Sequence, residues 1–405
     1  MTKLAWRNIW RNRRRTAITL ASIAFGLAAI LFVQSLIKTI QLQLIEKATG
    51  VFTGHVQVVA KGVDDYKLPD KNIKDIARVE KAAAALPGVV EYGKRLHITG
   101  LASSDSDSAG VLLCGVEPGK ERRITSMHSY KTQGEYLRDP SAPEAYIGAK
   151  LAEQLGVGLG GDLVLMASAS DGSIGAERFR IVGVFQTGSH TFDAQLVYVP
   201  LAPLQGMLAL EGRINNLIVR LADPQRIYEA RAELAAGLSD LPVEAVTWEQ
   251  IDHELVGIRR YQNALLSIVL AVVFAIVALG VANTLLMSMF ERLREFGVLR
   301  ALGARPSFIV RTVLLESFLL CLCGTALGVA LGAGAIFYYR RAGLVLPLKD
   351  AVSYFMPFDT VLYLRFNWPM HIAALASVLL TSLLAGLPPA LKAAKLKPTE
   401  ALRYL

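Results

Sequence analysis

Four stretches of the 405-residue chain are long and apolar enough to cross a lipid bilayer. The hydrocarbon core, about 30 Å thick, needs roughly 20 helical residues, whereas a buried helix of a soluble domain seldom has more than about 14 such residues. The charged fraction of 19% also lies below the roughly 25% typical of soluble domains. The sequence therefore predicts four transmembrane helices, whose nearly uncharged cores are residues 16–37, 262–290, 312–339 and 366–391.

The first apolar stretch is expected to stay in the mature protein as a membrane anchor. Its 22 residues exceed the 7–15 of a signal peptide, and no Ala-x-Ala cleavage site precedes Lys38. With their flanks, we assign the helices to residues 16–40, 259–290, 312–339 and 366–391, with a large domain at 41–258 and a short loop at 340–365.

The net charge of +9 is concentrated beside the predicted spans. Residues 1–15 carry six Lys and Arg and no acid, the 291–311 segment carries five against two Glu, and the 392–405 tail carries four against one. Residues 38–260 instead hold 24 basic and 28 acidic side chains. This positive-inside pattern predicts cytoplasmic termini, a cytoplasmic 291–311 segment and an extracytoplasmic domain, and it argues against nucleic acid as the partner.

The large domain reads as a mixture of strands and helices. Short β-branched runs at 55–59, 179–185, 195–201 and 216–221 predict strands, and amphipathic patterns at 70–88 and 223–238 predict helices. We expect an α+β domain of two subdomains, with residues of about 110–200 inserted between strand-helix units at both ends, placed between the first and second transmembrane helices.

Two segments carry patterns typical of membrane helices. In residues 1–15, Trp6 and Trp10 are four residues apart, with Arg7 and Arg11 on the opposite side. This favours an interfacial helix over a plain basic stop signal. In the third span, small residues recur every four positions, which favours close packing against another helix over contact with lipid. These residues are Gly324, Gly328 and Gly332.

No stretch of the sequence predicts a catalytic or metal site, so we do not expect the chain to be an enzyme. The 156–161 run GVGLGG follows a helix pattern and precedes a strand, which is the reverse of a dinucleotide motif and indicates a helix end. The 103–108 run SSDSDS lacks the glycine and glutamate of a calcium loop and predicts a hairpin tip. His371 is expected at the interface rather than on a metal, and Glu316 in a structural role rather than in ion coupling.

The 291–304 segment, ERLREFGVLRALGA, lies between the second and third spans and alternates acidic and basic residues before an apolar patch. It resembles the signature of FtsX-like ABC transporter permeases, with Phe296 where Ile is usual. The ending PPALKAAKLKPTEALRYL at 388–405 and the runs at 147–166, 179–193 and 197–201 resemble the same family, the latter its MacB-like periplasmic core domain.

The resemblance implies that 291–304 is a coupling helix that docks on a separate cytoplasmic ATPase subunit, which binds ATP and Mg. The residues implicated are Glu291, Arg292, Arg294, Glu295, Gly297, Val298, Leu299, Arg300, Leu302 and Gly303. It also implies a bacterial inner-membrane complex of two ATPase subunits with a second permease copy or paralogue. Such permeases act by mechanotransmission, in which closure at the cytoplasmic side moves the periplasmic domains.

Three functions remain open at the level of sequence. The start of the chain and the TGHVQVV run at 53–59 resemble lipoprotein-releasing (LolCDE-type) permeases, which favours lipoprotein release in contact with membrane lipids. MacB-like tripartite efflux of drugs, peptides or toxins, with a periplasmic adaptor, is the second possibility. ATP-driven signalling to a cell-wall enzyme is the third.

Overall fold

The computed structural model describes residues 2–61, 70–345, 359 and 361–395. The chain divides into two compact units. The first, which we call the helical unit, comprises residues 1–41, 259–345 and 361–405, and the second, the sheet unit, comprises residues 42–258 and 346–360. The last ten residues of the family-like C-terminal ending, 396–405, lie outside the described residues.

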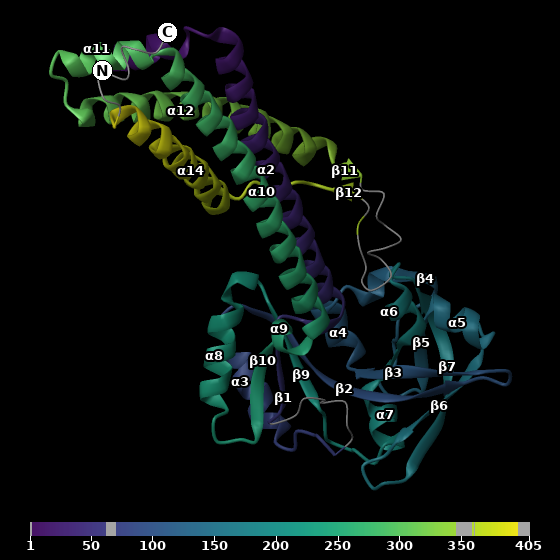
Figure 1. Cartoon of the computed structure of the whole chain (residues 1–405). Coiled ribbons are helices and arrows are strands. Elements are labelled where there is room, and N and C mark those ends of the chain that lie inside the picture. Colours follow the sequence, from purple (N-terminus) through teal and green to yellow (C-terminus); the bar gives the residue numbers. More distant parts are fainter. Residues whose placement is uncertain (1, 62–69, 346–358, 360, 396–405) are drawn as a thin grey trace. The chain divides into compact units, whose positions relative to one another are not determined.

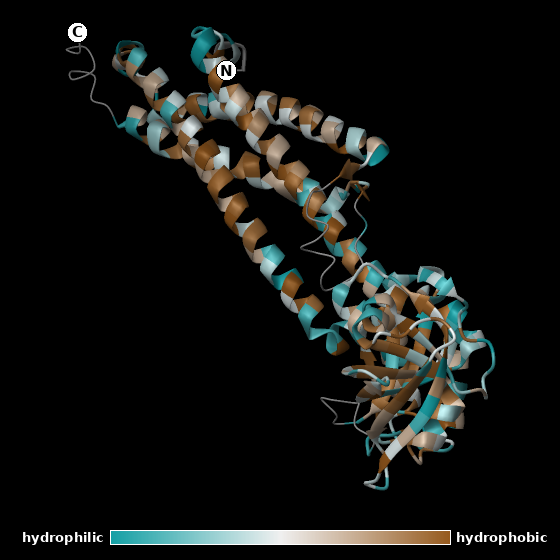
Figure 2. Ribbon diagram, turned by 90° about the vertical axis from the view of Figure 1, so that its right-hand side faces the viewer, coloured by the Kyte–Doolittle hydropathy of each residue, from teal (hydrophilic) through white to brown (hydrophobic). Residues whose placement is uncertain are grey.

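In the described part of the helical unit there are four long helices, and each covers all or nearly all of one predicted apolar stretch (Figure 1). Figure 2 shows hydrophobic residues along most of their lengths. At 1.5 Å per residue the 39 residues of α10 reach roughly 58 Å, which exceeds the bilayer core. The prediction of four spanning helices is confirmed, with bounds α2 (Arg13–Ala48), α10 (His253–Glu291), α12 (Pro306–Ala342) and α14 (Trp368–Ala394).

Two short helices, α1 (Thr2–Ile9) and α11 (Leu293–Ala301), lie at the end of the helical unit where α2 begins and α10 ends. The single helix expected over residues 1–15 is wrong, because α1 stops at Ile9 and α2 starts at Arg13. Thr16 Oγ1 donates to the carbonyl of Ile9 at 2.5 Å and so satisfies a helix-end acceptor that a continuous helix would have bonded itself.

Within the described residues of the sheet unit, ten strands form one connected sheet. Their bounds are β1 (Val56–Ala60), β2 (Val89–Ser103), β3 (Ser108–Val116), β4 (Lys131–Gly134), β5 (Glu144–Gly148), β6 (Asp162–Ser168), β7 (Ile174–Phe185), β8 (Leu196–Pro200), β9 (Asn216–Leu221) and β10 (Val243–Thr247). The remaining short helices are α3 (Ile76–Ala85), α4 (Pro118–Ile124), α5 (Ala149–Leu155), α6 (His190–Gln195), α7 (Leu201–Met207), α8 (Ile227–Gly237) and α9 (Trp248–Ile251), with single turns η2 (Met127–Tyr130) and η3 (Pro224–Arg226). In the helical unit, β11 (Leu344–Val345) pairs with β12 (Val361–Leu362).

The sheet has two parts that share the long strand β2. Strands β10, β1, β9 and β2 are antiparallel neighbours, with α3 and α8 beside them (Figure 1). Strands β2, β3, β8, β5, β7 and β6 form a closed ring, because β6 pairs with both β7 and β2. The ring strands other than β2 all come from residues 108–200, and β4 extends from β7.

Local predictions in this unit follow from ordinary capping and turn chemistry. The helix expected from residue 70 begins only at Ile76, because the Asp75 side chain accepts from Arg78 N at 3.3 Å and caps it. The 156–161 glycines end α5, with Gly156 at φ 63° before β6 starts. The 103–108 run is confirmed as the tip between β2 and β3.

Candidate functional site

Helix α11 presents an apolar face to the outside of the chain. Leu293, Phe296 and Gly297 are buried against the helical unit, whereas Val298 is 44% exposed and Leu302, just after the helix, is 80% exposed. Among the other predicted coupling residues, Leu299, Arg294 and Gly303 are exposed, and Arg300 is half-buried with a bond from Nη1 to the carbonyl of Ala304 at 3.1 Å. The exposed apolar residues Val298, Leu299 and Leu302 are called the α11 face below.

The charged residues beside this face bond within the chain. Arg292, which is buried, donates from Nη1 to Glu316 Oε1 at 2.7 Å and from Nε to Glu295 Oε2 at 3.1 Å. Burial acts to lower the pKa of Arg292, but the Glu316 and Glu295 carboxylates together outweigh burial and raise that pKa above its usual range. Asn8 Nδ2 also donates to Glu316 Oε1, at 2.6 Å. Glu316 therefore joins α1, α11 and α12.

Two further ion pairs fasten this end of the helical unit. Arg11 donates to Glu295 at 2.7 Å, and Arg15 donates to both oxygens of Glu291 at 2.9 and 3.2 Å. Thus Arg292 and Glu295 hold α11 against α12 and the N-terminal segment, and Glu291 holds the end of α10 against α2. Exposed pairs of this kind are individually weak, but here they flank a buried pair and act as a network.

A cleft of about 640 Å³ opens between α1, α11 and α12 beside this network. Arg7 and Trp10 line it from the N-terminal segment, Leu299 from α11 and Phe308 from α12. The predicted pair Trp6 and Trp10 packs edge to face with ring centroids 6.1 Å apart, and both rings are about half exposed.

The three glycines predicted to pack are buried on the side of α12 that faces α2. A Cβ at Gly324 would lie 2.7 Å from the Ile23 side chain, and one at Gly328 would lie 2.9 Å from the Ala24 carbonyl oxygen. At Gly332 a Cβ would come within 3.0 Å of Leu31. Because glycine has no side chain, these positions let the backbones of α12 and α2 approach each other, as small residues do in membranes.

The C-terminal end of α2 continues into a π-helical turn, η1 (Thr49–Thr53), which is embedded in the sheet unit. Val51, 1% exposed, packs among the aromatic side chains of the ring, including Tyr146, Phe185 and Tyr198. Phe52 stacks on His97 at 5.2 Å. The chain leaves the turn at Gly54, where φ is 63° and where a Cβ would lie 2.5 Å from Ile218. Only glycine fits this exit.

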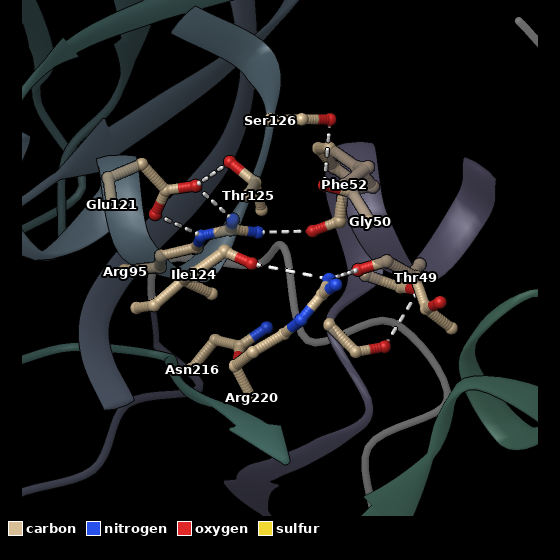
Figure 3. Close-up of polar contacts among 12 residues, drawn as sticks. Thr49, Gly50, Phe52, Arg95, Glu121, Ile124, Thr125, Ser126, Asn216 and Arg220 are labelled. Atoms are coloured by element: carbon tan, nitrogen blue, oxygen red, sulfur yellow. Dashed lines mark hydrogen bonds and ion pairs between the residues drawn. The ribbon is translucent and has the colours of Figure 1, made fainter. Parts of the chain in front are cut away.

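Side-chain and main-chain donors of the sheet unit bond the carbonyl groups that η1 leaves open (Figure 3). Arg220 Nη1 donates to the carbonyl of Thr49 at 3.4 Å, Ser126 N to that of Gly50 at 2.8 Å, and Arg95 Nη1 to that of Phe52 at 2.5 Å. Cations and N–H donors are the partners that a helix C-terminus favours, because its carbonyls carry partial negative charge. We call this set of contacts the joint.

The cation at the centre of the joint is fully buried. Arg95 is 0% exposed and forms a two-point ion pair with Glu121, whose Oε1 also accepts from Thr125 Oγ1 at 2.6 Å. Burial acts to lower the pKa of Arg95, but Glu121, together with the neighbouring Tyr198 and Cys114, outweighs burial and raises that pKa, so the guanidinium stays charged. Arg95 is also the residue of β2 that pairs with both β9 and β3, where the two parts of the sheet meet.

The sequence did not single out Arg95, Glu121 or Arg220. A weak signal exists in β2, where Arg95 and His97 alternate with apolar residues of a strand that is buried on both sides. The partner acid is 26 residues away on α4, and no spacing rule connects the two.

Comparison with known proteins identifies both units. Residues 16–236 match the MacB-like periplasmic core domain and residues 267–398 match the FtsX-like permease C-terminal family. The chain is 23% identical to the lipoprotein-releasing system transmembrane protein LolC of Neisseria meningitidis serogroup B, over 96% of this chain and 94% of that protein. It is 26% identical to the macrolide export ATP-binding/permease protein MacB of a Shewanella species, over 99% of this chain and 60% of that protein.

Among solved structures, the periplasmic region of MacB from Actinobacillus actinomycetemcomitans is similar, with 15% identity and a TM-score of 0.38 over 52% of this chain and 97% of that one. The family matches together cover most of both units. The chain therefore belongs to the FtsX-like permeases with a MacB-like periplasmic core domain, the permease subunits of LolC- and MacB-type ABC transporters.

Proposed function

We propose that this permease carries ATP-driven movement from a cytoplasmic ATPase to its periplasmic domain and thereby releases lipoproteins from the membrane. One observation carries the proposal. Glu295 of α11 pairs with Arg11, two residues before α2, and Glu291 at the end of α10 pairs with Arg15 of α2, whose other end is held in the sheet unit by the joint. A push on the α11 face thus has a continuous bonded route to the sheet unit.

The orientation follows from the charges. The basic N-terminal segment and α11 lie at one end of the spans, which the positive-inside rule assigns to the cytoplasm. The sheet unit is then periplasmic, the protein sits in a bacterial inner membrane, and both termini are cytoplasmic. The ATPase, present as two copies with bound ATP and Mg, would contact the α11 face, and a second permease copy or paralogue would complete the transporter.

Lipoproteins are proposed as the substrate because the similarity to LolC extends over nearly the full length of both chains. Efflux of hydrophobic drugs, peptides or toxins is supported by the similarity to MacB. Purifying the native complex with its bound molecules separates the two: acylated protein in the complex supports release, whereas a periplasmic adaptor and an outer-membrane channel support efflux.

The docking step is tested with Val298→Asp and Leu302→Asp together. Charges placed on this apolar face would have to be desolvated against the ATPase, so the double variant should insert normally but lose copurification of the ATPase. Leu159→Asp, at a residue 51% exposed in the sheet unit, is the matched control and should retain the ATPase. If the ATPase copurified normally with the double variant, the assignment of α11 as the docking helix would be wrong.

A further inference from the structure

A second cleft, of about 490 Å³, lies between α2, α10 and the start of α14. It is at the end of the helical unit opposite to α11, because α2 ends there while α10 and α14 begin there. Its walls are mixed: Ile37, Leu266 and Met370 are apolar, and the rest of the lining consists mostly of amide and cationic side chains.

The Gln34 side chain lines this cleft and is 6% exposed. Its Oε1 atom is buried and has no hydrogen-bond partner within the described part of the chain. Its polar neighbours on α2 are satisfied: Ser35 Oγ bonds to His371 Nε2 at 2.9 Å, and Thr39 Oγ1 accepts from Arg365 N at 3.1 Å. A buried amide is costly without a partner, so Gln34 indicates a ligand that supplies a donor.

The charge of the cleft is positive. Lys38 and Arg259 line it, and no acidic side chain is among its lining residues. Lys38 forms no ion pair or hydrogen bond with any described residue. Gln41 Nε2 donates to Asn263 Oδ1 at 2.8 Å, which holds α2 and α10 together at the cleft. The site therefore offers cations, a buried acceptor and an apolar wall in one place.

We propose that this cleft binds the headgroup of an anionic phospholipid. The phosphodiester oxygens would accept from Lys38 and Arg259, a headgroup hydroxyl would donate to Gln34 Oε1, and an acyl chain would lie along Ile37 and Leu266. A soluble phosphate would satisfy the cations but would leave the apolar wall empty. This binding goes beyond the proposed function, since it requires neither the ATPase nor a particular transported substrate.

The test uses the purified full-length chain, without the ATPase, in nanodiscs of phosphatidylcholine with or without phosphatidylglycerol. Native mass spectrometry should show retained phosphatidylglycerol, with an affinity roughly tenfold lower in Lys38→Gln, since one charge-assisted bond is lost. Arg260→Gln removes the neighbouring, exposed cation that does not line the cleft, and it should bind as the unmodified chain does.

Gln34→Leu separates a binding role from a folding role. Without added lipid its unfolding temperature should equal or exceed that of the unmodified chain, because the variant removes an unsatisfied polar group. The rise in unfolding temperature on adding phosphatidylglycerol should be lost. Equal retention of phosphatidylcholine, equal losses in Lys38→Gln and Arg260→Gln, or an equal thermal shift with glycerol phosphate or inorganic phosphate would each overturn the proposal. A failure of ATPase docking would leave these measurements unchanged.

Discussion

His55 lies directly after the joint, just before β1, and its side chain is 3% exposed. Its Nδ1 atom accepts from Leu221 N at 3.0 Å, so this nitrogen carries no proton. Burial, followed by the nearby Arg220 guanidinium, lowers the pKa of His55 to about 4 from 6.5. A neutral ring is thus part of the packing between β1 and β9.

This histidine predicts a defined loss of stability in acid. Above pH 6.5 the ring is neutral in both folded and unfolded chains, and the full stability is present. As the pH falls from 6.5 to about 4, the unfolded chain takes up the proton first, and the free energy of unfolding decreases by roughly 3 kcal/mol. Hydrogen exchange of the β1 and β9 amides in the full chain, corrected for intrinsic rates, measures this slope.

His55→Asn keeps an acceptor for Leu221 N but cannot titrate, so its pH slope in that window should be flatter. His128→Asn, at an exposed histidine, is the control and should keep the slope of the unmodified chain. A slope that is the same in His55→Asn and the unmodified chain would exclude His55 as its source.

At the scale of secondary-structure elements, the contact between helices α2 and α12 depends on close packing. Inside a bilayer the apolar environment of a helix does not drive helices together, so close packing of small residues has to hold them. Gly328 makes the closest approach to backbone atoms of α2, at the Ala24 carbonyl oxygen and Cα.

Gly328→Ala should therefore destabilise the chain. The added Cβ would have to displace backbone atoms of α2, at a cost of roughly 1–3 kcal/mol. Gly334→Ala, on the same helix with no atom within 4 Å of the added Cβ, should be neutral or stabilising by up to about 1 kcal/mol through helix propensity. Thermal unfolding in detergent compares the two, and equal shifts would show that packing at Gly328 is not limiting.

The helices and strands could be predicted from the sequence where they depend on local residue patterns or on the length of an apolar stretch. Apolar length predicted α2, α10, α12 and α14, and amphipathic period and turn residues predicted α3, α8 and the strand runs. The end of α1 at Ile9 escaped prediction, because Arg11 and Asn12 are acceptable helix residues. The break is instead accompanied by tertiary contacts, such as that of Arg11 with Glu295.

The joint escaped prediction for the same reason. Arg95 and Glu121 look like ordinary surface charges in the sequence, and their burial depends on strands and helices that meet only in the folded sheet unit. The proposed docking residues were named through family resemblance, but the resemblance did not show that Arg292 and Glu295 are bonded within the chain.

At the scale of the whole molecule, a variant with an altered joint should keep ATP hydrolysis but lose most of substrate release. The double variant Arg95→Met with Glu121→Met replaces the buried pair by apolar side chains, which folded proteins often tolerate. Either single change would instead leave a buried charge without its partner. The carbonyl of Phe52 then loses its donor. We expect continued ATPase activity of the assembled transporter with release reduced roughly tenfold.

The pair Arg123 and Glu91, 2.7 Å apart with side chains 67% and 15% exposed, lies nearer the surface and offers the control, and its double Met variant should preserve both activities. Hydrogen exchange at β2 verifies that the sheet unit is folded in each variant. If hydrolysis and release fell together in the Arg95 and Glu121 variant, the joint would be needed for assembly or folding rather than for transmission.

The way the carbonyls of η1 are bonded has a practical consequence for chimeric transporters. The last turns of α2 and the first residues of α10 belong to the sheet unit, which spans residues 42–258. If a periplasmic domain were exchanged between relatives at the edges of the apolar stretches, the end of α2 would come from one protein and the arginines that bind it from the other. Crossover points at 41/42 and 258/259 would instead move the donor's helix end together with the side chains that bind it.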